Sequence, residues 1–310
     1  MVCNAQTDFT YTGDTNNHTS YTINYYSSNL NNMSTDRLDS LLSRFSLNAR
    51  LFFSGALCGV TNFDEEEGIG YIHVIKRGPV EIRHSHEAKV RTLHVEKPSL
   101  LFYPRPLAHS FITDKHDGAD MVCASVRYNL GQINPIANAL PPIMAVPLAE
   151  LPDLMPVVDL MFTEAFTHQC GRQAVLDRLF EVLIIHLLRK AMNDKLLDSG
   201  LLAGLAHAQL AKSLVALHDK PADVWTLESL AAVAGMSRSA FANAFRDTIG
   251  MTPGDYVTCW RLTLAQDHLQ RGRSLKHVAM EVGYGSPVAL ARAFKARTGQ
   301  TTRQWQATAK

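Results

Sequence analysis

The sequence predicts a multidomain α+β protein, in which an N-terminal antiparallel β-barrel and a helical hairpin precede a C-terminal all-α double helix-turn-helix. Three observations support this fold class. Short β-type runs separated by turn residues recur between residues 52 and 130, two long helical patterns follow up to residue 193, and one helix-turn-helix pattern is written twice between residues 230 and 305. The expected domains are residues 1–32, 33–150, 151–200 and 201–310 of the 310-residue chain.

The first 32 residues are dominated by Asn, Thr, Ser and Tyr, with almost no aliphatic pattern to bury. This composition favours a flexible tail, because such a segment cannot offset the entropy lost on folding. Met33 precedes a capping signal and a helical pattern that continues to Leu42. We therefore expect Met33 to be the natural start of the chain or an alternative one.

Six strands are predicted for the barrel, at residues 71–75, 80–86, 92–95, 100–103, 110–113 and 121–128. Gly-Pro, Lys-Pro, Pro-Arg-Pro and Asp-Gly turns separate them, and this regular spacing is typical of a small antiparallel barrel or sandwich. The proline-rich residues 130–151 are expected to wrap irregularly across the barrel.

Two helices are expected next, at residues 153–168 and 171–193. The second has an apolar arc wider than packing on one neighbour requires, formed by Leu176, Leu179, Phe180, Leu183, Ile184, Leu187 and Leu188. Two interpretations remain open: the helix packs on the barrel and on a second subunit, or it is buried entirely within its own chain. A linker is expected at residues 198–200.

The C-terminal repeat is visible in its glycines. Gly235 and Gly250 of the first copy correspond to Gly283 and Gly299 of the second, 48 and 49 residues further on. Each copy is expected to fold as a helix, a tight turn and a second helix that ends at the later glycine.

The second helix of each copy should bury one face and leave the other free. Phe241 and Phe245 lie four residues apart in the first copy, as do Leu290 and Phe294 in the second. Ser237 and Ser286 are suitable N-caps. A helix at about residues 206–218 should open the domain, and an amphipathic helix at residues 253–269 should join the two copies.

Charge is distributed unevenly along the chain. Residues 203–310 hold 13 Lys and Arg against 7 Asp and Glu, a net charge of +6, whereas residues 1–202 hold 17 against 22, a net charge of −5. A basic module fused to a mildly acidic one points to a nucleic-acid partner for the C-terminal part.

The five cysteines, Cys3, Cys58, Cys123, Cys170 and Cys259, form no CxxC pair. This argues against zinc fingers and a disulfide framework, and it suits a reducing cytosol. No run reaches membrane-spanning length and no signal sequence precedes the tail, so we expect a soluble, cytoplasmic protein with no membrane partner.

Residues 203–307 closely resemble the DNA-binding domain of the AraC/XylS transcription regulators. The residues that carry the resemblance are Gly250, Thr252, Pro253, Tyr256, Arg261, Ala265, Leu269, Ala279, Gly283, Tyr284, Arg292, Phe294, Lys295 and Gly299. Leu290, Thr302 and Trp305 depart from the commoner residues without threatening the fold. The resemblance implies a DNA-binding transcription regulator, an activator or a repressor, rather than an enzyme, with double-stranded promoter DNA and RNA polymerase as partners.

In such regulators two recognition helices enter successive major-groove segments about 34 Å apart. The resemblance directs two sets of side chains to the bases, Ser239, Ala242 and Asn243 in the first helix and Pro287, Val288, Ala291 and Arg292 in the second. Asn243 suits adenine, Arg292 suits guanine, and the apolar side chains suit a thymine methyl. Phosphate contacts are expected from Arg238, Arg246 and Lys295, and the alternative for Arg292 is a structural ion pair.

Residues 95–109 resemble the strand-turn-strand segment of a cupin barrel, which ends in a histidine, His109. Cupin enzymes bind a metal through an HxH pair, a following carboxylate and a later histidine. His84, His86 and His109 match the histidines, but Glu87 comes too early, and Lys89 and Val90 stand where an acid is expected. We expect that the protein requires no cofactor. The alternative is that the barrel binds a metal and that the protein is a cupin-type metal enzyme with a DNA-tethering tail.

The N-terminal half also resembles, more distantly, the cupin-type AraC regulators that respond to reactive chlorine or other oxidants. The resemblance implies redox sensing through Cys58, ahead of the barrel, and Cys123, in the last predicted strand. Two hypotheses for the effector remain open, thiol oxidation and a small organic ligand. Cys170 and Cys259 are expected to be packing residues.

Overall fold

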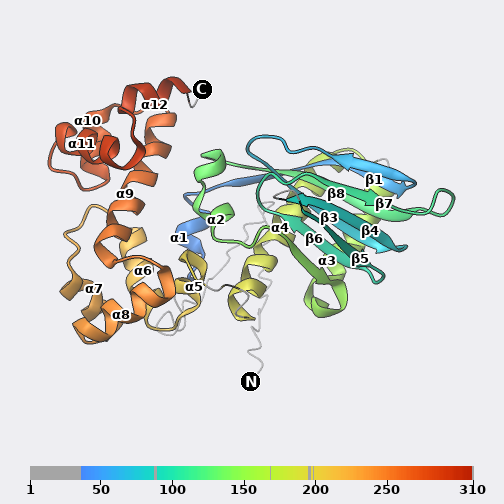
Figure 1. Cartoon of the computed structure of the whole chain (residues 1–310), viewed down its shortest axis with the longest axis horizontal. Coiled ribbons are helices and arrows are strands. Elements are labelled where there is room, and N and C mark those ends of the chain that lie inside the picture. The colour runs from blue at the N-terminus through green and yellow to red at the C-terminus, as the bar shows by residue number, and fades with distance from the viewer. Residues whose placement is uncertain (1–35, 87–88, 168, 195–196, 198, 309–310) are drawn as a thin grey trace, which may run out of the picture. The chain divides into compact units, whose positions relative to one another are not determined.

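The computed structural model describes residues 36–308 except 87–88, 168, 195–196 and 198 (Figure 1). The predictions of a flexible tail and of a start at Met33 lie outside these residues. The strands are β1 (Leu47–Leu57), β2 (Val60–Phe63), β3 (Ile69–Arg77), β4 (Val80–His86), β5 (Lys89–Val95), β6 (Ser99–Tyr103), β7 (His109–Ile112), β8 (Ala119–Tyr128) and β9 (Met144–Pro147).

The helices are α1 (Asp39–Leu42), α2 (Pro135–Asn138), α3 (Met155–Phe166), α4 (Arg172–Asn193), α5 (Leu201–Ala206), α6 (Leu210–Asp219), α7 (Leu227–Ala234), α8 (Arg238–Ile249), α9 (Pro253–Gln270), α10 (Leu275–Glu281), α11 (Pro287–Thr298) and α12 (Thr302–Thr308). We call residues 36–193 the β-domain and residues 201–308 the helical domain. No helix in the described part of the chain is long and apolar enough to cross a membrane.

The β-domain is built from two antiparallel sheets with the strand orders β1-β8-β3-β6-β9 and β2-β7-β4-β5. The predicted fold class is confirmed, with one correction: the two ladders do not join into one closed barrel. All six predicted strands form. The sequence did not predict β1, β2 or β9, and the last is an edge strand paired only with β6, where a proline is tolerated.

The central strands β8, β3 and β6 of the five-stranded sheet are buried on both faces, as the alternation along β3 illustrates. Tyr71, His73 and Ile75 face the interior between the two sheets, whereas Ile72 and Val74 belong to the core shared with the helices. The cover on the outer face is α4, which packs along β1. The apolar arc of α4 is buried by its own chain, apart from the partly buried Leu179.

The helical domain contains the doubled pattern as predicted, as α7 and α8 followed by α10 and α11, with α9 between them. The opening helix predicted at about residues 206–218 forms as α6 but begins later, at Leu210, and a separate helix that was not predicted, α5, precedes it. His207 leaves the helical conformation, and its Nδ1 accepts hydrogen bonds from the backbone of Gln209 and Leu210 at 3.3 Å, which caps α6.

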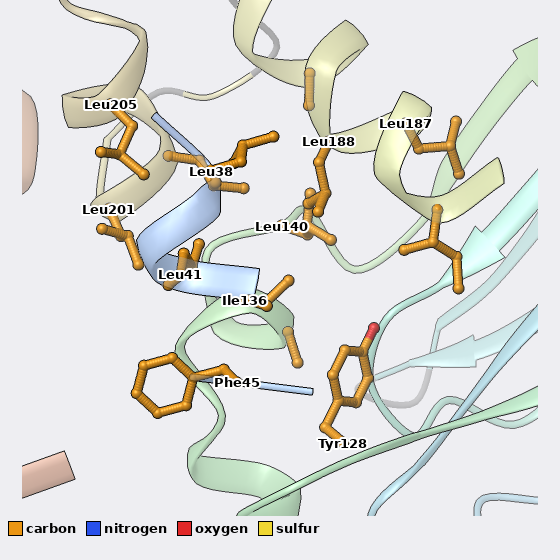
Figure 2. Close-up of a cluster of buried hydrophobic side chains, with 14 of the residues drawn as sticks. Leu38, Leu41, Phe45, Tyr128, Ile136, Leu140, Leu187, Leu188, Leu201 and Leu205 are labelled. Atoms are coloured by element: carbon orange, nitrogen blue, oxygen red, sulfur yellow. The ribbon is translucent and has the colours of Figure 1, made fainter. Parts of the chain in front are cut away.

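The two domains share one hydrophobic core. We call the part of this core that lies between them the joint, and its residues include Leu38, Leu41, Phe45, Leu201, Leu205 and Trp260. Figure 2 shows Leu38 and Leu41 of the segment around α1 beside Leu201 and Leu205 of α5, with Phe45 below them. The Phe45 ring meets the Trp260 ring of α9 edge to face, with centroids 5.3 Å apart. The first described residues therefore lie between the sheet and the helical domain.

Polar contacts add to the joint. Arg37 donates from Nη1 to the carbonyl oxygens of Leu205 and Ala206, at 3.1 and 3.2 Å. Asn129, directly after β8, donates from Nδ2 to Asp267 Oδ1 of α9 at 3.0 Å. Asp267 is 6% exposed, so this hydrogen bond to a carboxylate is shielded from water.

Candidate nucleic-acid interface and sensory site

The first candidate recognition helix is α8. Ser237 caps it by accepting a hydrogen bond from Ala240 N at 3.4 Å. The predicted pair Phe241 and Phe245 is buried, whereas Ser239 and Asn243 are exposed and Ala242 is partly exposed. Burial of the aromatic pair fixes the rotation of α8 about its own axis. The side chains predicted to read bases therefore lie on the solvent-facing side of this helix.

The second candidate recognition helix, α11, has the same arrangement. Leu290 and Phe294 are fully buried, and Ser286 caps the helix by accepting from Ala289 N at 3.1 Å. The predicted base contacts Pro287 and Ala291 are partly exposed. Val288 and Arg292 are exposed, Val288 to 69%. An apolar side chain so exposed suits contact with a thymine methyl.

The two helices differ in whether the arginines predicted to contact DNA also form ion pairs within the protein. Arg292 makes no ion pair with any residue of the described chain, which disfavours its structural alternative. Arg238 pairs with Glu228, with Nε 3.1 Å from Oε1, and both side chains are more than half exposed. Such a surface pair is weak, so it does not prevent a phosphate contact. Arg246 and Lys295 are exposed.

The interior of the β-domain holds a buried histidine pair that the sequence did not predict. His73 Nε2 of β3 lies 3.1 Å from His109 Nε2 of β7. His109 Nδ1 lies 2.8 Å from the Leu107 carbonyl, which only accepts, so this nitrogen carries a hydrogen. In the neutral ring His109 Nε2 then accepts from His73. The alternation of Tyr71, His73 and Ile75 was the available signal for His73.

Burial keeps both rings of this pair neutral. It lowers the pKa of His109 to about 4 and the pKa of His73 well below its usual value. His109 is held between the stacked rings of Phe63 and Tyr103, with centroids 4.8 and 4.0 Å away. His73 Nδ1 has no hydrogen-bond partner among the residues described. The interior is thus a neutral polar network surrounded by aromatic rings.

The described residues do not fit a cupin metal centre. His84 Nε2 is 2.8 Å from the Tyr103 hydroxyl, and His109 uses both ring nitrogens on other partners. His86 ends β4, and its side chain lies outside the described residues. Among the side chains that are described, no three His, Cys, Asp or Glu come together in a geometry able to bind a metal. The hydrogen bonds of His84 and His109 thus occupy ring nitrogens that the predicted barrel metal would need.

The two candidate sensory thiols lie far apart. Cys58 is exposed, and its Sγ lies against Gly118. Cys123 is buried in β8, five residues after Gly118. At about 3.3 Å per residue this separation is about 16 Å, well beyond the reach of a disulfide. Burial raises the pKa of the Cys123 thiol, which disfavours its reactive thiolate.

Cys123 is instead a neighbour of the histidine pair. It is directly opposite His73 in the β3–β8 ladder, and both side chains face the interior. The remaining cysteines divide: Cys259 of α9 is partly buried, as a packing residue would be, but Cys170 is exposed. The expectation that Cys170 packs is wrong, because it lies in the turn before α4 rather than on a helix.

Comparisons with known proteins match both domains. A cupin family model matches residues 36–193, about half of the chain, and a helix-turn-helix domain model matches residues 230–308. An HTH-type transcriptional regulator of Haemophilus influenzae is 28% identical over 283 residues, 84% of this chain and 93% of that protein.

Other relatives match over shorter stretches. An AraC-like transcription regulator of Streptomyces antibioticus is 39% identical over 52% of this chain and 54% of its own length. The transcriptional activator RclR of Escherichia coli, named as specific for RCS, is 34% identical over 35% of this chain and 39% of its own length. A crystal structure of the AdpA DNA-binding domain with target DNA is 30% identical, covering 33% of this chain and 93% of that one, with a TM-score of 0.32.

Proposed function

We propose a function from the premise that this chain belongs to the AraC-type transcription regulators with an N-terminal cupin domain. In this function α8 and α11 read two successive major-groove segments of promoter DNA, and the β-domain controls this binding. The observation that carries the proposal is the repeated division of the two helices. Each buries its apolar pair and leaves free the side chains with base-reading chemistry, above all Asn243 and Arg292.

A selection experiment tests the reading of DNA. The full chain would be used to enrich duplexes from a library with about 30 random base pairs, a length that holds two segments one helical turn apart. We expect two enriched segments with centres separated by about 10 base pairs. Enrichment of a single segment, or of none, would contradict reading by both helices.

The joint supports control by the β-domain. Phe45 and Asn129 of the β-domain contact Trp260 and Asp267 of α9, the helix that joins the two reading units. A change in the β-domain that alters these contacts would alter the placement of both units. Contact with RNA polymerase and activation of transcription are further parts of the proposal. A homodimer that forms through α4 is also proposed, because the apolar side chains of Val175 and Val182 on this helix are exposed.

The effector is proposed to be an oxidant or a small molecule, and the surroundings of the two thiols indicate which cysteine could respond to an oxidant. If thiol oxidation is the signal, the reactive group is Cys58, because Cys58 is exposed and Cys123 is buried with a raised pKa. The partner of Cys58 would then be a thiol other than Cys123, since about 16 Å separates the two along the strand.

We expect Cys58 to react with a maleimide at least about tenfold faster than Cys123, because thiolate character and access control the rate. Mass spectrometry of timed digests gives both rates. In DNA-binding assays with and without hypochlorous acid, Cys58→Ser should abolish the response and Cys123→Ser should retain it. Identical responses of both variants and the unaltered chain would remove the thiol hypothesis and leave the small ligand.

A further inference from the structure

The side chain of Arg261, in the middle of α9, is bound to the loop between α6 and α7. Its Nε donates to the carbonyl oxygen of Pro221 at 2.8 Å, and its Nη2 donates to that of Asp223 at 2.7 Å. One guanidinium thus ties two backbone carbonyls of the loop to the helix that joins the reading units. The planar arrangement of guanidinium donors suits such a two-point contact, and a lysine offers no equivalent.

The turn of the second unit meets the same loop. Gly283, at the end of α10, has φ +82°, and a Cβ added there would lie 2.7 Å from Ala222 Cα and 2.9 Å from Arg261 Nη2. Real Cβ atoms do not approach backbone atoms so closely, and this φ also disfavours any residue with a side chain. The second unit can therefore rest against this loop only because residue 283 is glycine.

The equivalent glycine of the first unit makes no such contact. Gly235 has a similar φ of +67°, but a Cβ added there would meet no atom within 4 Å. The two positions of the repeat thus share a positive φ and differ in their surroundings. The close approach at Gly283 is a feature of how the two units meet, rather than of the helix-turn-helix turn itself.

We propose that Arg261, Gly283 and the loop 221–223 form an inter-unit contact that fixes the orientation of α11 relative to α8 and so sets the spacing of the two DNA segments that the protein reads. This inference rests on the proposed function. Arg261 is a positioning residue, which acts through the loop rather than on DNA. Without the contact, the second unit is attached to the first mainly through the end of α9 and is freer to rotate about it.

The experiment compares Gly283→Ala and Arg261→Met with two matched controls. Gly235→Ala introduces the same backbone strain without the close contact, and Lys212→Met removes an exposed positive charge from α6 of the same domain. Each full-length variant is put through the duplex selection described above. We expect the controls to enrich two segments at the spacing of the unaltered chain, and Gly283→Ala and Arg261→Met to enrich the same segments at altered or broader spacings.

Affinity measurements separate positioning from loss of folding. Binding to the selected two-segment duplex should fall at least about tenfold in Gly283→Ala, because linked modules gain affinity only when both engage. Binding to a duplex with the first segment alone should not change. An equal loss on both duplexes, or an unchanged spacing, would overturn the inference.

A DNA-independent measurement distinguishes failure of this inference from failure of the proposed function. Spin labels carried by non-natural amino acids at the exposed positions Ala240 of α8 and Ala289 of α11 report the distance between the helices. We expect one narrow distance distribution in the unaltered chain and in Gly235→Ala, and a broader one in Gly283→Ala. Equal widths would contradict the inter-unit contact even if no DNA segment were selected.

Discussion

Replacement of Phe45 by alanine is expected to separate the unfolding of the helical domain from that of the β-domain. Phe45 is fully buried in the joint and its ring packs edge to face on Trp260. Truncation of a buried phenylalanine costs about 3 to 5 kcal/mol, through lost burial and the cavity that remains. Here most of that loss falls on the contact between domains, because the ring lies between α1 and α9.

Thermal unfolding followed by calorimetry measures this effect. The unaltered chain should unfold with strongly coupled domains, and Phe45→Ala should show two resolved transitions. Phe166→Ala is a suitable control, because that ring lies on α3, is 56% exposed and stacks on Phe162 away from the joint. A single transition in Phe45→Ala, at the temperature of the control, would show that the coupling of the domains does not depend on Phe45.

Replacement of Arg292 by alanine is expected to weaken binding to the selected duplex by about 1 to 3 kcal/mol and to relax the preference at one base position. The side chain is exposed and has no ion-pair partner in the described chain, so its donors are available for the O6 and N7 of guanine. Binding titrations against the four single-base variants of each position would identify the base.

Lys295→Ala is the comparison for Arg292→Ala. Lys295 is exposed on the same helix, but it lies in the last turn, where a phosphate contact is expected. Its loss should weaken binding to all sequences alike and reduce the slope of log affinity against log salt by about 1. If Arg292→Ala behaved in the same way, with unchanged base selectivity, Arg292 would be a phosphate contact.

The helical domain was predictable because its signals are local. Ser237 and Ser286 cap helices a few residues before the buried pairs that fix their faces, and the repeat supplied each signal twice. In the β-domain, β4 was predicted at its observed bounds, whereas β9 was not predicted, because it contains Pro147 and forms only through pairing with a distant strand.

The joint and the interior pair could not be predicted, because they join residues that are far apart in the sequence. Arg37 and Leu205 are 168 residues apart, and Asn129 and Asp267 are 138 apart. Neither pair has a periodicity or a motif that would relate its members. His73 and His109 meet because β3 and β7 face each other across two sheets, which the strand pattern alone does not determine.

The course of β8 has a thermodynamic consequence. This strand carries Cys123 beside His73, and six residues later, about 20 Å along the strand, Asn129 is bound to Asp267 of α9. If a ligand in the interior changes the affinity of α8 and α11 for DNA through this connection, reciprocity requires that DNA change the affinity for that ligand by the same factor. Promoter DNA would then be an effector of the β-domain, and the concentration of ligand that half-saturates it would differ between free protein and protein bound at its promoter.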